Sequence, residues 1–160
     1  MSDTLTHFDP HGAARMVTIS VKPETPRMAA ARARVRMQPA TLARIREGDV
    51  GKGDVLGVAR LAAIAGSKQT PGIIPLCHPV RVTAVDVQFS LDEALPGVVV
   101  EARVEAVDRT GPDMEAMTAA ATAALTIYDM CKAMDRGMTI EAVELTAKEG
   151  GKSGRWLRED

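Results

Sequence analysis

The chain has 160 residues, of which 46% are hydrophobic and 2% aromatic, and its formal net charge is -1. This length and composition suit one globular domain, expected over residues 1–160, that can bury a core without disulfides or metals. The charge and the scarcity of aromatic side chains argue against nucleic acid as a partner, and the absence of a long apolar run argues against a membrane span.

The two cysteines, Cys77 and Cys131, are not spaced as a metal-binding pair. We therefore expect no metal and no cofactor, and a reducing compartment, with the cytoplasm as the default. The polar start of the chain lacks the layout of a signal peptide, so residues 1–15 are predicted to be a mobile N-terminal tail.

The first predicted element is a strand over 29–38, where small or apolar residues alternate with arginines and give the strand a basic outer face. A short helix is predicted over 39–49, because a proline suits its start and Gly48 its end. A second helix, largely buried, is predicted over 53–70, with Asp54 as its N-cap.

Residues 71–80 hold three prolines, which predicts an ordered loop that is neither helix interior nor central strand. Alternating segments at 81–90 and 97–108 predict two antiparallel strands joined by a hairpin connection. An alanine-rich, proline-free segment predicts a long helix over 113–136, and alternation over 138–149 predicts a last strand.

The order strand, helix, strand, strand, helix, strand predicts an α+β, ferredoxin-like βαββαβ domain with helices on one face of an antiparallel sheet and one extra short helix. The helix over 113–136 is apolar on several faces, so one sheet face is not expected to cover it. Association of subunits is therefore plausible.

Asp129 and Lys132 lie three residues apart on the predicted long helix, and hence on one face. On spacing alone a surface ion pair is favoured. The apolar neighbours favour partial burial instead, which would move both pKa values toward neutrality and build a proton-transfer pair.

Glu115 begins the same helix, where acidic residues are favourable without any function. Glu115 and Asp129 are fourteen residues apart, which corresponds to about 21 Å along a helix. One subunit therefore cannot bring both carboxylates to one small ligand, and a shared site would have to lie at a subunit interface.

Several basic residues are individually weak candidates, since charged residues usually face solvent. Lys52 precedes a helix start, where free amides attract anions, although a solvated loop lysine is an equal alternative. His78 lies between prolines, and a lone histidine is more often structural than a ligand. Together, these and other cations are sufficient to neutralise a polyphosphate: Lys68, Lys148, Lys152, Arg27 and the stripe Arg32, Arg34 and Arg36.

The stretch "EGGKSG" near the C-terminus resembles the end of a phosphate-binding loop. A P-loop needs a glycine at position 146, which is Thr146, and a following helix, for which too little chain remains. Residues 150–160 are predicted to be a flexible tail. For a triphosphate substrate, which the family resemblance given next implies, we expect this tail to close over the site and bring Lys152 toward the phosphates.

Four segments, "KGDVLGVARLAAI", "IIPLCHP", "DMEAMTAAATAALTIYDMCKAMDRGM" and "KEGGKSG", closely resemble the MoaC family of cyclic pyranopterin monophosphate synthases, which act in molybdenum cofactor biosynthesis. The resemblance implies a homohexamer, a trimer of dimers with sites at dimer interfaces. It also implies a lyase reaction in which 3',8-cyclo-7,8-dihydro-GTP, supplied by a partner radical enzyme, becomes cyclic pyranopterin monophosphate with loss of pyrophosphate.

The resemblance also implies roles for particular residues. Asp129 takes the catalytic position, and Lys132 and Lys52 take those of the essential lysines. The remaining positions fall on substrate-binding segments or around the phosphates: Leu76, Cys77, His78, Met114, Glu115, Lys68 and Arg27. Asp113 stands where the family commonly has Glu, so it is left outside the catalytic set. A non-catalytic nucleotide-binding module and a purely structural oligomer remain as alternatives.

Overall fold

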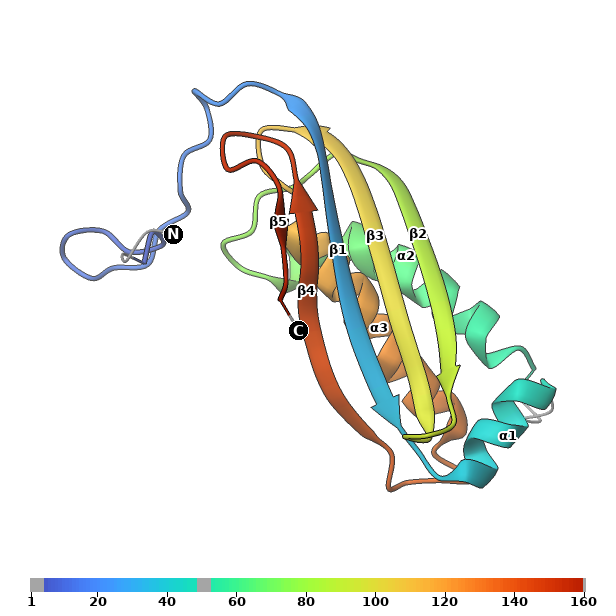
Figure 1. Ribbon diagram of the computed structural model, residues 1–160. Helices are drawn as coiled ribbons and strands as arrows, with labels where there is room; N and C mark the ends of the chain where they lie inside the picture. Colours follow the sequence, from blue (N-terminus) through green and yellow to red (C-terminus); the bar gives the residue numbers. More distant parts are fainter. Residues whose placement is uncertain (1–4, 49–52, 160) are drawn as a thin grey trace.

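The computed structural model describes residues 5–48 and 53–159, which form one sheet and three helices (Figure 1). Their bounds in chain order are β1 Thr25–Arg36, α1 Pro39–Glu47, α2 Val55–Ile73, β2 Val82–Asp92, β3 Gly97–Asp108, α3 Asp113–Cys131, β4 Thr139–Glu149 and β5 Trp156–Leu157. The sheet is antiparallel, with strand order β2-β3-β1-β4-β5.

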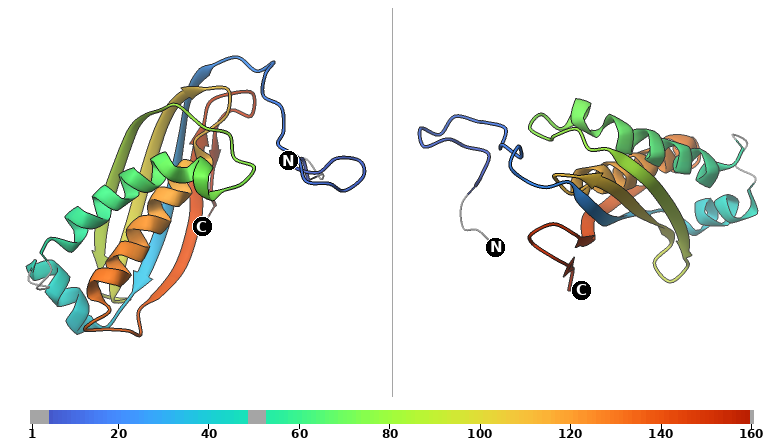
Figure 2. Two further views of the ribbon diagram at one scale, coloured as in Figure 1. Left: turned by 180° about the vertical axis from the view of Figure 1, so that it is seen from behind. Right: turned by 90° about the horizontal axis from the view of Figure 1, so that it is seen from above.

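The structure confirms the ferredoxin-like arrangement. Helices α2 and α3 lie together against one face of the sheet, and the other face is left open (Figure 2). Strand β5 was not predicted, and it adds two residues to the outer edge of β4. Helix α1 extends from the end of β1 and lies beside the hairpin end of the sheet.

Strand β1 follows the predicted alternation. Ala29, Ala31, Ala33 and Val35 are buried beneath the helices. The arginines face the other way, and two of them meet glutamates of β4: Arg32 pairs with Glu144 at 2.6 Å and Arg36 with Glu141 at 2.5 Å. The basic face of this strand is thus largely neutralised by its neighbour.

Both buried helices begin as predicted but end differently. Helix α2 was predicted to stop before Pro71, yet it continues to Ile73. Proline removes one helical N–H donor there, but the N–H of Ile74 still donates to the carbonyl of Thr70 at 2.9 Å and closes the last turn.

The predicted helix over 113–136 was too long, because α3 ends at Cys131. The chain turns after Lys132, so that the buried carboxylate of Asp135 accepts hydrogen bonds from the backbone N–H groups of Gln38, at 2.8 Å, and Gly137, at 3.1 Å. This turn ties the end of α3 to the start of α1.

Helices α2 and α3 approach closely because small residues line their contact. Five alanines of α3 are completely buried: Ala116, Ala119, Ala120, Ala123 and Ala124. At the crossing, a Cβ atom placed on Gly66 of α2 would lie 2.3 Å from Oγ1 of Thr122. The same Thr122 hydroxyl lies 3.2 Å from the carbonyl oxygen of Ala62, so a polar contact also crosses between the helices.

Among the described residues, no helix combines the length and hydropathy that a membrane span requires. Within the same part of the chain, no three histidine, cysteine or carboxylate side chains are grouped as metal ligands would be.

Gly66→Ala should destabilise the fold by about 1–3 kcal/mol, because the added methyl group overlaps Thr122. Gly72→Ala, in the same helix with open space around its Cβ position, is the matched control and should be neutral or slightly stabilising. Denaturant unfolding measures both variants. Equal stability of the two variants, or no recovery when Thr122→Ala is combined with Gly66→Ala, would contradict this account of the crossing.

Candidate active site

The loop after α2 and the start of α3 meet at one end of the domain and enclose a cavity of about 540 Å³. It is lined by Leu76, Cys77 and His78 from the loop and by Asp113 and Met114 from α3. The structure thus brings together the two segments for which substrate binding was predicted, although they are more than thirty residues apart in the chain. The prolines of the loop restrict its backbone and so fix these side chains in place.

Glu115 lies behind this cavity and is only 1% exposed. The Cys77 thiol points to one carboxyl oxygen, with Sγ 3.9 Å from Oε1, while Oε2 is buried without a partner among the described residues. Burial raises the pKa of Glu115 to about 7; a backbone hydrogen bond lowers the pKa against this effect, and the negative charge of Asp113 adds a smaller upward contribution. This carboxyl group can therefore take up or release a proton near neutral pH.

The same surroundings act on Cys77. Burial raises the pKa of its thiol above the ordinary value, and the neighbouring charge of Glu115 adds to the effect. The thiol is thus neutral near pH 7 and acts as a hydrogen-bond donor and a wall of the cavity, since nucleophilic chemistry would require the thiolate.

Asp113 is held by a cation from the sheet. The ammonium group of Lys148 on β4 lies 2.5 Å from Oδ2, and Oδ1 is buried without a described partner. Asp113 and Glu115, two residues apart at the start of α3, thus each keep one buried carboxyl oxygen for which the described residues supply no partner. Buried acceptors of this kind are costly unless a ligand or water donates to them.

Lys148 was considered in the sequence only as one weak cation among several. Val143 and Leu145 pair with Ala33 and Ala31 and so share their helix-facing side. Regular alternation from these two residues would point Lys148 to the open face of the sheet. A β-bulge at Thr146 shifts the register, so that Lys148 pairs with Ala29 instead and shares its helix-facing side. No residue type near Thr146 announces this bulge.

Asp108 at the end of β3 fixes the two loops that border the cavity: the loop between α2 and β2, and the turn between β3 and α3. Its carboxylate accepts hydrogen bonds from the backbone N–H groups of Arg81, at 2.9 Å, and Arg109, at 2.7 Å. Burial alone would raise the pKa of Asp108, but these bonds and the two guanidinium charges outweigh it, so the pKa lies below the ordinary value. The carboxylate thus stays charged and holds the loops together.

Asp129 and Lys132 lie at the other end of α3 and form an ion pair at 2.5 Å. Their side chains are 65% and 51% exposed, so the expected partial burial is wrong for the isolated subunit. The hydrogen bond from Lys132 to Asp129 and the carboxylate charge raise the pKa of the lysine, which is the opposite of the expected movement toward neutrality.

The length of α3 separates the two groups. Glu115 and Asp129 lie on the same continuous helix, fourteen residues apart, which places them about 21 Å from each other along its axis. One subunit therefore does not assemble the buried carboxylates and the Asp129–Lys132 pair around one small ligand.

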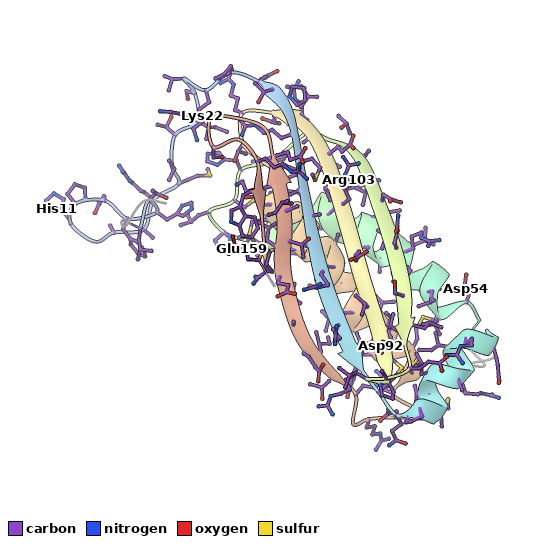
Figure 3. The ribbon with its side chains drawn as sticks, in the orientation of Figure 1. His11, Lys22, Asp54, Asp92, Arg103 and Glu159 are labelled. Carbon is purple, nitrogen blue, oxygen red and sulfur yellow. The ribbon has the colours of Figure 1, made fainter. Side chains whose placement is uncertain are left out.

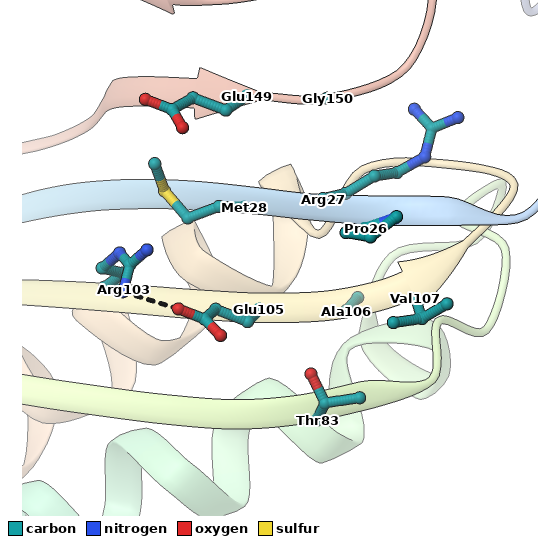
Figure 4. A pocket seen from close by; sticks show the side chains of 10 residues that line it. All are labelled: Pro26, Arg27, Met28, Thr83, Arg103, Glu105, Ala106, Val107, Glu149 and Gly150. Carbon is teal, nitrogen blue, oxygen red and sulfur yellow. Dashed lines mark ion pairs between the residues drawn. The ribbon is translucent and has the colours of Figure 1, made fainter.

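The other predicted cations are scattered. Lys52 lies outside the described residues, Lys68 is exposed on α2, and Lys152 is exposed in the turn before β5. Arg27 starts β1, where its Nε donates to the carbonyl of Asp108 at 2.9 Å. It lines a separate hollow of about 390 Å³ on the open face of the sheet, between β1, β3 and the end of β4 (Figure 4).

The model of the MoaC family matches residues 16–151, which include every described element except β5. The chain belongs to the MoaC family. It is also 54% identical over 158 residues to the cyclic pyranopterin monophosphate synthase of Heliobacterium modesticaldum, and the match covers 99% of each chain.

The region that matches the MoaC family includes most of the residues around the cavity. Both loops of the cavity, the whole of α3 and Lys148 fall within the matched residues. The predicted roles of the individual side chains still rest on the resemblance of their motifs, and the structure adds their burial, their partners and their separation.

The raised pKa of Glu115 predicts a pH-dependent stability. Because its folded-state pKa of about 7 exceeds the ordinary 4.5, the folded state binds more protons between these values. The free energy of unfolding should therefore fall as pH rises through this range, by up to about 3 kcal/mol at about 1.4 kcal/mol per pKa unit. Glu115→Gln removes this component, so the variant should gain stability relative to the wild type as pH rises.

Denaturant unfolding at a series of pH values measures the difference. Glu47→Gln, which neutralises an exposed carboxylate at the end of α1, is the control and should run parallel to the wild type. Parallel profiles for Glu115→Gln as well would show that Glu115 does not carry the extra proton.

Proposed function

We propose that this chain is a cyclic pyranopterin monophosphate synthase, a phosphorus–oxygen lyase of molybdenum cofactor biosynthesis. Its substrate is 3',8-cyclo-7,8-dihydro-GTP, and its products are cyclic pyranopterin monophosphate and pyrophosphate. The observation that carries the proposal is the cavity beside α3, which Asp113 lines and behind which Glu115 contacts Cys77, inside a region matched by the MoaC family; each carboxyl group has a buried oxygen without a described partner.

The unpartnered oxygens suit the ring of this substrate. A guanine-derived ring presents several N–H donors on one edge, and carboxylates accept such donors in pairs. Glu115, with a pKa of about 7, also has a proton available to exchange with a ring nitrogen or carbonyl as bonds rearrange. The carboxyl groups of Asp113 and Glu115 thus favour binding of the heterocyclic end of the substrate.

The triphosphate requires cations. As the cyclic phosphate forms, a substrate oxygen bonds to the α-phosphorus and the bond to pyrophosphate breaks, so negative charge accumulates on the leaving oxygens. Lys52, Lys68, Arg27 and Lys152 are proposed to stabilise that charge. Lys132 and Asp129 are proposed to transfer protons, with Lys52 as the second essential lysine.

The separation along α3 supports an interface site. We propose that Asp129 and Lys132 of one subunit complete the site around Glu115 of another, in a homohexamer built as a trimer of dimers. Exposed apolar side chains on the helices are available for contact between subunits, among them Leu61 at 67% and Leu125 at 58% exposure. The proposed enzyme works in the cytoplasm, downstream of a radical enzyme that cyclises GTP.

A non-catalytic nucleotide-binding module on the same fold is the second candidate. It would use the cavity and the cations but would have no need of Asp129 and Lys132. Binding of the cyclised nucleotide by the wild type without release of pyrophosphate would favour it.

Asp129→Asn should lower turnover of the cyclised nucleotide about a hundredfold or more, because it removes a proton acceptor beside Lys132. Pyrophosphate release and product formation measure the loss. Glu93→Gln breaks another exposed ion pair, with Arg46 at 2.5 Å, and is the matched control that should keep wild-type turnover. Wild-type turnover in Asp129→Asn would remove the proposed role of this carboxylate.

Mixed oligomers test the interface. Asp129→Asn and Glu115→Gln subunits, each inactive alone, should recover about a quarter of wild-type activity when co-expressed, since half of randomly formed dimers are mixed and each then holds one intact site of two. Mixing either variant with itself is the control. No recovery in verified mixed oligomers would show that both carboxylates act within one subunit.

A further inference from the structure

The N-terminal arm, defined here as residues 5–24, extends away from the domain and has a structure of its own (Figure 1). Oδ1 of Asp9 accepts hydrogen bonds from the backbone N–H groups of His11 and Ala13, both at 2.9 Å. The N–H of Arg15 donates to the carbonyl of His7 at 2.8 Å, and Gly12 takes a positive φ of 83° in the turn. Residues 7–15, within the segment predicted to be a mobile tail, thus form a hairpin closed by hydrogen bonds of its own.

The base of the arm is attached to the loops that line the cavity. Nη1 of Arg109 donates to the carbonyl of Ser20 at 3.1 Å, and Arg81 forms an ion pair with Glu24. The backbone N–H groups of Arg81 and Arg109 are the two that Asp108 holds. The arm and the cavity walls are therefore fixed by one cluster of charges.

The hairpin returns to the cavity through His7. His7 lines the cavity of about 540 Å³ together with Cys77, His78 and Met114. His11 lies at the outer tip of the hairpin and points away from the domain (Figure 3). Both arm histidines are exposed, and of the two His7 borders the cavity.

The position of the arm is not explained by core packing. Its apolar side chains remain exposed, with Leu5 at 80%, Phe8 at 47% and Met16 at 52%. Burial of these residues contributes little to the fold, yet the hairpin is internally bonded and brings His7 to the edge of the cavity. The match to the MoaC family begins only at residue 16, so the hairpin lies outside the region that defines the family.

We propose that the N-terminal arm is a strap across the cavity and that His7 donates a hydrogen bond from its imidazole to an anionic phosphate group of the substrate. The inference rests on the proposed function for the identity of the substrate. With the heterocycle on the carboxylates of Asp113 and Glu115, the phosphates extend toward the mouth of the cavity, where the arm supplies a donor. The carboxyl groups of Asp113 and Glu115 thus orient the heterocyclic end of the ligand, and the imidazole of His7 orients its phosphate end.

Full-length His7→Ala, Asp9→Ala and His11→Ala test the strap. His7→Ala should raise the KM for the cyclised nucleotide about tenfold or more, the effect of one lost hydrogen bond to a charged group, with much less change in kcat. Asp9→Ala frees two backbone N–H groups, loosens the hairpin and should raise KM similarly. His11→Ala, in the same hairpin, should match the wild type.

A second measurement does not depend on turnover. Alkylation of Cys77 by iodoacetamide, followed by mass spectrometry of its peptide, should be severalfold faster in Asp9→Ala than in the wild type or His11→Ala, because the loosened strap uncovers the cavity. The strap is overturned if the alkylation rates are equal, and the role of His7 is overturned if His7→Ala keeps the wild-type KM. Failure of the wild type to turn over the nucleotide would instead overturn the proposed function, while the alkylation rates would still decide the strap.

Discussion

The close packing of α3 between α2 and the sheet determines how the rest of the molecule can act. Its completely buried alanines and the contact of Thr122 with Gly66 leave no room for the helix to bend or shift. Its two ends therefore remain at a fixed separation, with buried carboxyl groups at one end and an exposed ion pair at the other. In the proposed assembly a neighbouring subunit would cover that ion pair. Desolvation would then lower the pKa of Lys132, which in the isolated subunit is raised by Asp129.

The periodic pattern of apolar residues, together with helix-capping residues, predicted most elements of this fold, because a single local rule decides each of them. Strand β1 alternates since one face is buried, and Asp54 begins α2 since its Oδ1 accepts from the N–H of Gly57 at 2.8 Å. The errors lie where a tertiary contact decides the end of an element. Helix α3 stops early because Asp135 turns inward to Gln38, and α2 passes Pro71 because the N–H of Ile74 still donates to the carbonyl of Thr70 and closes the last turn.

The site, too, was predictable in part. The segments around Cys77 and Glu115 carry distinctive residues, so the resemblance of their motifs brings them into one site. Lys148 was not predictable as the partner of Asp113, because a single bulge moves it to the other face of β4. The exposure of Asp129 was misjudged since its apolar neighbours Ile127 and Met130 are turned toward the core, while a helix carries the residue between them on a different side.

The glycines of the "EGGKSG" stretch have a structural task that the comparison with a P-loop did not suggest. Gly150 and Gly151 take positive φ values of 96° and 69°, and a Cβ on Gly151 would lie 2.2 Å from a guanidinium nitrogen of Arg27. The turn therefore packs directly on Arg27, which in turn bonds to the carbonyl of Asp108. The N-terminal arm is anchored at the same residue through its two backbone partners. Segments near both ends of the chain are thus connected, through Arg27, Arg81 and Arg109, to Asp108, whose carboxylate also holds the backbone on either side of the cavity.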